Sequence, residues 1–482
     1  MSGERRGGGW ALALLASTQL LLIMDTAIVN VALHSIGDDL GVGSAALSWV
    51  ANAYLIAFGG LLLLAGRAAD LLGHRRLFAG GLSLLGGASA VGALAQSAGV
   101  LVAARAVQGA GAALAAASAF ALLLLLFPEG SGRHRALGVF AAMGGLGGVS
   151  GTVMGGVLTD LLGWRSTFWL NVGLVLLMAP AALRLLGPGR RAPVAGFDLG
   201  GAVTATGGLG LVAYALVDRS LLAGAAGLAL LGLFAVLETR PQALRLGRAG
   251  GTPVARPLVP PALAKRRNLR LANGLSALAQ TALFPMFFLV SLYLQSVLGY
   301  TPLGGGLGLL PLSLAVVAVA PQTGRLIGRL GLPRTTTLGF ALLCGGMLWL
   351  ALGLSADGTF SGTVLAPSLV LGVALPLVVV TTNVAATAEA APEETGLASG
   401  LVNTSQQFGS VLGLAVLVAV ADAVTGTDAT APAQTTGFRA ALLVGAAFAA
   451  SAALLSLRLR PPSPALGPAA TPREDRVVGD PR

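Results

Sequence analysis

Residues 66–76 read Gly-Arg-Ala-Ala-Asp-Leu-Leu-Gly-His-Arg-Arg, and residues 324–334 read Gly-Arg-Leu-Ile-Gly-Arg-Leu-Gly-Leu-Pro-Arg. A constant offset of 258 places Gly66, Arg67, Gly73 and Arg76 on Gly324, Arg325, Gly331 and Arg334. The second copy has Gly328 where the first has Asp70. The repeat indicates two related halves, and duplicated halves around a central cavity are typical of membrane transporters.

The composition places these halves in a membrane. Of the 482 residues, 55% are hydrophobic and only 10% are charged, and the mean hydropathy is +0.83. An ordinary soluble chain carries about 25% charged residues, so this chain has too few charges to cover a water-exposed surface. We therefore expect a polytopic membrane protein.

Spans of about 20 apolar residues divide the chain into fourteen predicted membrane helices. They fall near 11–34, 45–65, 77–97, 100–126, 136–160, 166–186, 199–217, 220–238, 271–298, 303–324, 335–355, 361–387, 398–421 and 438–457. The expected fold is all-α, with two six-helix bundles and two inserted spans between them. The predicted units are a six-span bundle over 1–190, two inserted spans over 191–240, a cytoplasmic linker over 241–268, a six-span bundle over 269–460, and a disordered cytoplasmic tail over 461–482.

The arginines predict the orientation. Arg5 and Arg6 before an apolar run resemble a signal peptide, but that run is long and contains Asp25 and Asn30, so we interpret it as an uncleaved first span. If the N-terminus is cytoplasmic, all of the 30 Lys and Arg residues lie in cytoplasmic segments except Arg105, Arg165, Arg219 and Arg439. The positive-inside rule requires this asymmetry. The expectation is a multi-pass protein of a bacterial inner (plasma) membrane with both termini in the cytoplasm.

Several classes of function are disfavoured. One cysteine and three scattered histidines predict no metal site. The single lysine, Lys265, follows Ala264, so no ATP-binding P-loop can be written, and we expect no cofactor and no ATP. The net charge of +11 lies in the loops and does not predict nucleic-acid binding. A polytopic membrane enzyme would need a polar catalytic loop, whereas residues 239–270 are rich in Arg, Pro and Gly. We interpret that segment as a linker that touches anionic lipid, and we predict no catalytic residues.

Four motifs resemble the fourteen-span drug/proton antiporters of the major facilitator superfamily. Residues 66–76 are similar to motif A, residues 101–111 to motif B, and residues 25–33 to the motif of the first span. Gly138, Gly147, Gly151, Gly155 and Gly156 fit the spacing of the antiporter motif C. Similar short matches are Gly163-Trp164-Arg165, Asn171-Val172, Tyr293-Leu294-Gln295 and 403–407. The resemblance runs from about residue 10 to 460, but Thr152, His34 and Gly173 replace prolines that are usual in the family.

Two charged residues, Asp25 and Arg105, lie deep inside predicted spans, away from their ends. A charge at mid-membrane costs around 2.5–3.5 kcal/mol, so Asp25 and Arg105 must face a cavity or a partner. We interpret Asp25 as a site that loads and releases a proton, and the resemblance implies that Arg105 tunes that proton transfer. A structural carboxylate and a helix-packing arginine are the alternatives, and the sequence does not show whether the two residues touch.

The remaining motif residues have proposed conformational roles. The resemblance implies a cytoplasmic gate formed by Gly66, Asp70, Gly73, Arg75 and Arg76; the alternative is a solvated basic loop. Gly147, Gly151 and Gly155 recur at a spacing of four, which puts them on one helix face and lets a neighbouring helix approach closely. That face is either a moving surface or static packing.

Polar side chains in several spans are candidates for a substrate cavity, although each could equally be a bond between helices. They are Asn30, Asn52, Tyr54, Tyr293, Gln295, Asn383, Asn403 and Gln406. Because Asp25 is the only deep acid, neutral or monovalent amphipathic compounds are the expected substrates. The sequence thus predicts a monomeric, proton-driven exporter of small amphipathic molecules. An importer or uniporter on the same fold is the alternative that Thr152 keeps open.

Overall fold

The computed structural model of the chain describes residues 2–127, 131–187, 199–217, 220–239, 266–388, 395–426 and 430–460. Those residues form fourteen α-helices and two short π-helical turns, and none of them lies in a β-strand. The first group is α1 (Ser2–Leu40), α2 (Ser44–Leu72), α3 (His74–Ala93), α4 (Ala98–Leu126), α5 (Ser131–Leu162), α6 (Arg165–Leu185), α7 (Leu199–Val217) and α8 (Leu221–Thr239). The second group is α11 (Arg267–Leu292), η1 (Tyr293–Val297), α12 (Pro302–Leu330), α13 (Leu332–Gly353), η2 (Phe360–Val364), α14 (Leu365–Thr387), α15 (Thr395–Thr425) and α16 (Ala431–Ser456).

Each predicted span overlaps one of these helices. Ten of the helices in the described ranges are long and apolar enough to cross a membrane. Shorter apolar stretches are Ala46–Leu62, Val203–Val212 and Leu221–Phe234. The protein is therefore multi-pass, while the count of fourteen spans stays a prediction. The predicted tail over 461–482, and the linker over 241–268 apart from residues 266–268, lie outside the described residues.

The repeated motif makes the same turn in both halves of the chain. Gly73 lies between α2 and α3 with φ +92°, and Gly331 lies between α12 and α13 with φ +81°. Only glycine adopts positive φ without steric cost. This requirement explains why both copies of the motif keep a glycine at that position.

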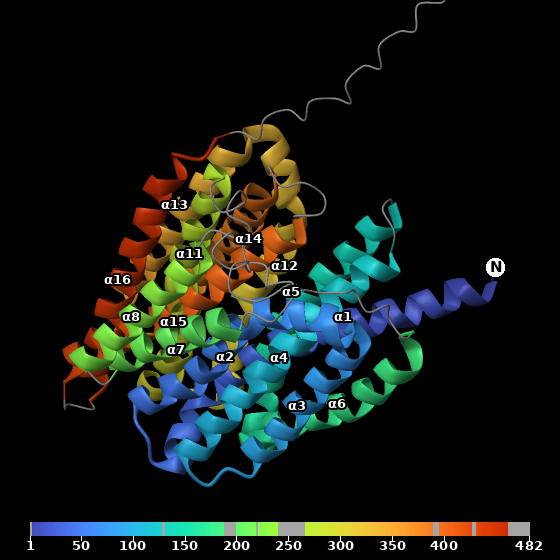
Figure 1. The fold of residues 1–482 in the computed structure, drawn as a ribbon. Coiled ribbons are helices and arrows are strands. Elements are labelled where there is room, and N and C mark those ends of the chain that lie inside the picture. The colour runs from blue at the N-terminus through green and yellow to red at the C-terminus, as the bar shows by residue number, and fades with distance from the viewer. Residues whose placement is uncertain are drawn as a thin grey trace, which may run out of the picture.

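Helices α1–α6 and α11–α16 form two groups (Figure 1), and two hydrophobic clusters divide the interior between them. One cluster lies mainly within α1–α6, which we call the N-terminal half, and includes Leu15, Phe78 and Leu82. The other lies mainly within α11–α16, the C-terminal half, and includes Phe340 and Met347. Helices α7 and α8 pack on each other, and α7 also packs on α2 and α15.

The two halves meet mainly where α5 packs on α12 and α2 packs on α15, and α1 makes smaller contacts with α11 and α12. We call the face where α2 ends and α3 begins the proximal face, and the opposite one the distal face. At the distal face a Cβ on Gly156 would lie 2.9 Å from Leu303 Cα, so α5 and α12 nearly touch there. At the proximal face a Cβ on Gly66, Gly324 or Gly328 would meet nothing within 4 Å. The halves are therefore in close contact near the distal face, and they also approach closely near the middle of α2 and α15, where a Cβ on Gly59 would lie 2.5 Å from Gln407 Cβ.

Candidate functional site

A buried ion pair lies in the middle of the N-terminal half. Arg105 Nη1 on α4 donates a hydrogen bond of 2.7 Å to Asp25 Oδ2 on α1. Each side chain is only 1% exposed. The tertiary structure thus brings together the two charged residues that the sequence placed inside separate spans.

Arg105 is held by three further groups. Its Nε donates to the Val50 carbonyl oxygen at 3.1 Å, and its Nη1 donates to Gln108 Oε1 at 3.1 Å. The guanidinium carbon also lies 4.3 Å from the ring centroid of Tyr54. A cation over an aromatic face is attracted by the ring quadrupole. Contacts from α2 and α4 therefore hold the guanidinium in place independently of Asp25.

Asp25 has a second partner on α6. The Asn171 amide Nδ2 donates to Asp25 Oδ1, while the amide oxygen of Asn171 has no hydrogen-bond partner. Asn171 is 1% exposed. The carboxylate is therefore clamped between an arginine on α4 and an amide on α6.

The network continues away from the ion pair to α3. Gln108 Nε2 donates to Ser89 Oγ at 2.7 Å, and Ser89 Oγ donates to the Leu85 carbonyl oxygen at 2.7 Å. Gln108 and Ser89 were not predicted as site residues. The signal for Gln108 is its spacing of three from Arg105, which places both side chains on one face of α4. Nothing in the sequence links Ser89 to the site.

Arg105 does not depend on Asp25 alone for its partners. Protonation would neutralise Asp25, and Arg105 would still bond the Val50 carbonyl and Gln108 and stack on Tyr54. The pair can therefore open without leaving a bare guanidinium, whose cost in an apolar interior would be large. In the described part of the chain, no group of three or more His, Cys, Asp or Glu could hold a metal ion.

The residues of the predicted gate lie at the proximal face. Arg75 Nη2 donates to the Leu183 carbonyl oxygen near the end of α6, so it is bonded within the N-terminal half. Arg76 is exposed, and the turn at Gly73 lies beside it. The side chain of Asp70 lies outside the described residues, so its role in a gate stays a prediction.

The glycines of α5 face two different neighbours. A Cβ on Gly147, Gly151 or Gly155 would crowd α1; at Gly151 it would lie 2.6 Å from Ala27 Cβ and 2.8 Å from the Met24 carbonyl oxygen. Gly156 instead faces α12, and Gly138 faces open space. The spacing of four thus forms a seam against α1 within one half, and Gly156 lies at the junction between halves.

Thr152, at the position where the resemblance to motif C implies a proline, bonds its own helix. Its hydroxyl donates to the Val149 carbonyl oxygen at 2.9 Å, and α5 runs without interruption through this position.

Some of the predicted cavity residues connect the two halves instead of lining an open space. Gln295 Nε2 in η1 donates to the Val31 carbonyl oxygen at 3.1 Å and to Ser291 Oγ at 3.0 Å. Ser291 Oγ in turn donates to the Asn30 carbonyl oxygen at 3.2 Å. Tyr293 bonds within its own half, donating from its hydroxyl to the Ser355 carbonyl oxygen at 2.6 Å. These bonds form a distal latch, by which we mean Ser291 and Gln295 on the carbonyls of Asn30 and Val31.

The other predicted cavity residues lie elsewhere. Asn52 is fully buried, and neither its amide nitrogen nor its amide oxygen has a partner. Tyr54 lies under Arg105. Asn383 bonds the Val379 carbonyl of its own helix at 2.8 Å, whereas Asn403 is exposed and Gln406 half-buried. Whether any of them contacts a substrate stays a prediction.

Comparison with known proteins shows which family the chain resembles. The family model of the Major Facilitator Superfamily matches residues 15–414. The chain is 36% identical over 422 residues to the cephamycin export protein of Amycolatopsis lactamdurans, covering 85% of this chain and 84% of that one. It is 35% identical over 467 residues to the puromycin resistance protein of Streptomyces alboniger, covering 93% and 89%.

Solved structures show the same fold at low sequence identity. A bacterial homologue of the human lysosomal transporter Spinster, in an inward-facing and unoccupied conformation, superposes with a TM-score of 0.69 at 14% identity, covering 94% of this chain and 96% of that one. The nucleoside transporter NupG superposes with a TM-score of 0.64 at 13% identity, covering 93% and 99%.

Proposed function

The chain belongs to the Major Facilitator Superfamily, and we propose that this membrane transporter exports small amphipathic compounds in exchange for protons. Two similar proteins are named for cephamycin export and puromycin resistance, which favours drugs, antibiotics or similar metabolites as substrates. The protein uses the proton-motive force, without ATP or a cofactor, and acts as a monomer.

The observation that carries the proposal is the ion pair of Asp25 and Arg105. Arg105 is among the largest fully buried side chains of the described residues. A membrane protein keeps such charges where a site needs them, since each is costly in an apolar interior. The partners of Arg105 other than Asp25 are neutral, so a proton can neutralise Asp25 while the arginine stays solvated by protein groups.

The arginine distribution supports the orientation proposed for the two faces. The proximal face, where Arg75, Arg76 and Arg334 lie, is cytoplasmic by the positive-inside rule. Both termini are then cytoplasmic, and the membrane is the bacterial inner membrane. The close contacts of the two halves at the distal face then correspond to a transporter that is closed to the outside.

These contacts support a mechanism of alternating access. In the state with the distal latch made, Asp25 gives its proton to the cytoplasm and the substrate enters from the proximal side. Opening of the latch and closing of the gate around Asp70 let a new proton reach Asp25 from outside and release the substrate there. One charge moved through 100 mV supplies about 2.3 kcal/mol, enough for a roughly fiftyfold gradient of a neutral compound.

The test is substrate-dependent proton flux in everted vesicles. Respiration acidifies the lumen, a panel of amphipathic compounds is added outside, and lumenal pH is followed. We expect some compounds to raise the lumenal pH with the native chain and to leave it unchanged with Asp25→Asn at matched expression.

The matched control is Asp39→Asn. Asp39 lies on the same helix, but its carboxylate is 45% exposed and pairs with the exposed Arg165, so this variant should keep at least half of the native flux. Equal responses of the native chain and Asp25→Asn would remove Asp25 from proton coupling. Substrate movement out of everted vesicles would instead establish the importer.

A further inference from the structure

A hollow at the proximal ends of α11 and α16 is lined by three arginines. It lies at the opposite face of the molecule from the distal latch. The hollow has a volume of about 420 Å³ and is lined by Arg267, Arg270, Leu271, Leu455 and Arg458. All three arginines are exposed. The groove therefore combines a positive rim with an apolar floor.

Within the described residues, no acidic side chain pairs with these arginines. The ion pairs of the described residues involve Asp25, Asp38 and Asp39, and none includes Arg267, Arg270 or Arg458. Arg267 makes only a long bond of 3.4 Å to the Arg458 carbonyl oxygen. Cations at the start of a helix oppose its dipole, so the stability of α11 does not account for Arg267 and Arg270. The rim is thus free to bind an anion.

The floor of the groove distinguishes between anions. Leu271 and Leu455 lie where the apolar spans Arg267–Val297 and Ala431–Ser456 reach the proximal face. A free phosphate would satisfy the arginines and leave both leucines in water. A phospholipid satisfies both, because its headgroup reaches the rim while its acyl chains cover the apolar floor.

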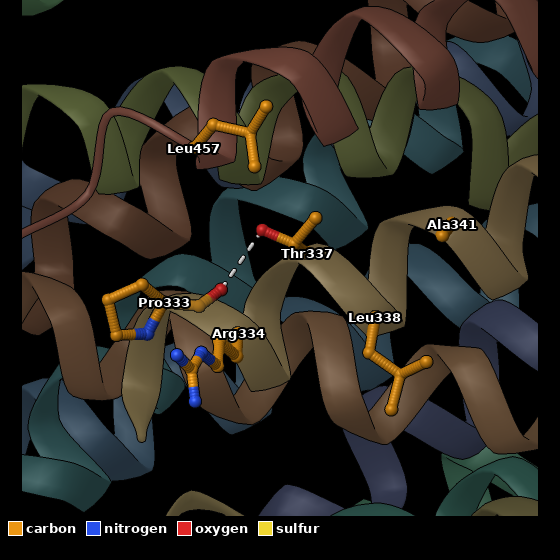
Figure 2. A pocket seen from close by; sticks show the side chains of 6 residues that line it. All are labelled: Pro333, Arg334, Thr337, Leu338, Ala341 and Leu457. Carbon is orange, nitrogen blue, oxygen red and sulfur yellow. Dashed lines mark hydrogen bonds between the residues drawn. The ribbon is translucent and has the colours of Figure 1, made fainter. Parts of the chain in front are cut away.

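A second hollow lies on the other side of the end of α16. It has a volume of about 270 Å³ and lies between α13 and α16, and Figure 2 shows its six lining residues. Thr337 ties the two helices together through a bond of 2.7 Å to Ser456 Oγ. Arg334, also exposed, adds a fourth cation at this helix end.

We propose that the groove between the proximal ends of α11 and α16 binds an anionic phospholipid through the phosphodiester of its headgroup. The leaflet from which the lipid comes rests on the proposed orientation of the protein. Binding itself does not, because it requires only the arginine rim and the apolar floor.

The experiment measures lipid binding to the purified full chain in detergent. Dioleoyl phosphatidylglycerol and dioleoyl phosphatidylcholine are titrated separately, and bound lipid is counted by native mass spectrometry. We expect phosphatidylglycerol to bind at least tenfold more tightly. Arg267→Gln/Arg270→Gln should weaken that binding about thirtyfold, because each arginine near an anionic surface contributes roughly a factor of five.

The matched control is Arg325→Gln/Arg329→Gln, which removes two exposed charges from the proximal end of α12 and should change binding less than threefold. Arg267→Lys/Arg270→Lys keeps the charge and should also stay within threefold, which keeps the test valid if the Gln variant does not fold. Equal losses in the two Gln variants would overturn the proposal. Equal binding of the two lipids would do so as well, and so would complete displacement of the lipid by millimolar inorganic phosphate.

Because no transport is measured, this result is separate from the flux test. A lipid site can fail while Asp25 still couples protons, and the reverse also holds.

Discussion

The two halves of the molecule have the same number of helices but differ in the residues that form their interiors. Both contain six helices in the described residues, and both make the positive-φ glycine turn of the repeated motif. The N-terminal half encloses Asp25 and Arg105 in a network that also reaches Asn171. With the same offset of 258, the position of Asp25 in the C-terminal half is Leu283, which is buried in an apolar cluster.

This difference favours different roles for the two halves, with proton coupling in the N-terminal half and structural support in the C-terminal half. The buried ion pair of Asp25 and Arg105 lies in one half, and the described C-terminal core around Phe340 and Met347 contains no buried acid or arginine. A change at Asp25 can reach the other half only through contacts between halves. The latch on the carbonyls of Asn30 and Val31 is such a contact, and it lies on α1, the helix that carries Asp25.

The largest expected effect comes from breaking the ion pair. Arg105→Met leaves the Asp25 carboxylate buried without its cation, and the expected loss of stability is about 3–5 kcal/mol. The loss should shrink as the pH falls, because a protonated Asp25 needs no partner. Thermal melting of the purified variants in detergent at several pH values measures both effects.

The C-terminal half supplies the control for that experiment. Arg439→Met removes an exposed arginine that donates to the Leu354 carbonyl at 2.7 Å, and it should cost about 1 kcal/mol. The double variant Asp25→Asn/Arg105→Met should recover part of the stability but no proton-coupled transport. If the Arg105→Met protein were as stable as Arg439→Met, the buried ion pair would contribute no more to stability than the exposed arginine. That result would contradict the difference between the two halves.

Alanine substitutions at glycines where two helices pack closely test whether the halves differ in function as well as in the residues of their interior. Gly151→Ala would push into α1 between Met24 and Ala27, which flank Asp25, and should cost about 1–3 kcal/mol. Gly372→Ala in the C-terminal half would lie 2.6 Å from Ala315 Cβ and should cost a similar amount. Of these two variants, only Gly151→Ala should change the pH dependence of transport, because it displaces the helix that carries Asp25.

The control for the seams is Gly148→Ala. No atom lies within 4 Å of a Cβ at Gly148, so alanine should be neutral or should stabilise α5 by up to about 1 kcal/mol. Equal changes in the transport pH profile for Gly151→Ala and Gly372→Ala would contradict the division of labour between the halves.

The smallest expected effect concerns the latch. Gln295→Leu removes the bonds to the Val31 carbonyl and Ser291, worth about 1 kcal/mol, and should shift the population towards a distally open state. A cysteine at Asn30 in a Cys344→Ser background should then react about fivefold faster with an impermeant maleimide. The control is Gln280→Leu, because Gln280 is a half-buried glutamine on α11; this variant should leave the maleimide reaction rate unchanged. If Gln295→Leu does not accelerate the reaction, the latch does not hold the distal side closed.

The sequence predicts the apolar helices and the charged residues within them, but it does not predict the hydrogen bonds between side chains on different helices. Asp25 and Arg105 stand out because each is the wrong residue type for an apolar span. Asn171 and Gln108 do not stand out, since buried amides are ordinary bonds between membrane helices. Gln295 was assigned to a cavity because a polar residue in a span looks the same whether it meets a substrate or a backbone carbonyl.

The sequence by itself determined the membrane environment, the positions of the helices, the repeat and its glycine turn, because each depends on composition, spacing or local backbone conformation. Only the tertiary structure decided that Asp25 meets Arg105 and Asn171, that the seam of α5 faces α1, and that Gln295 holds the distal latch. Those pairings join residues from 80 to 264 positions apart. No local pattern encodes such pairings, because they arise from how the helices pack.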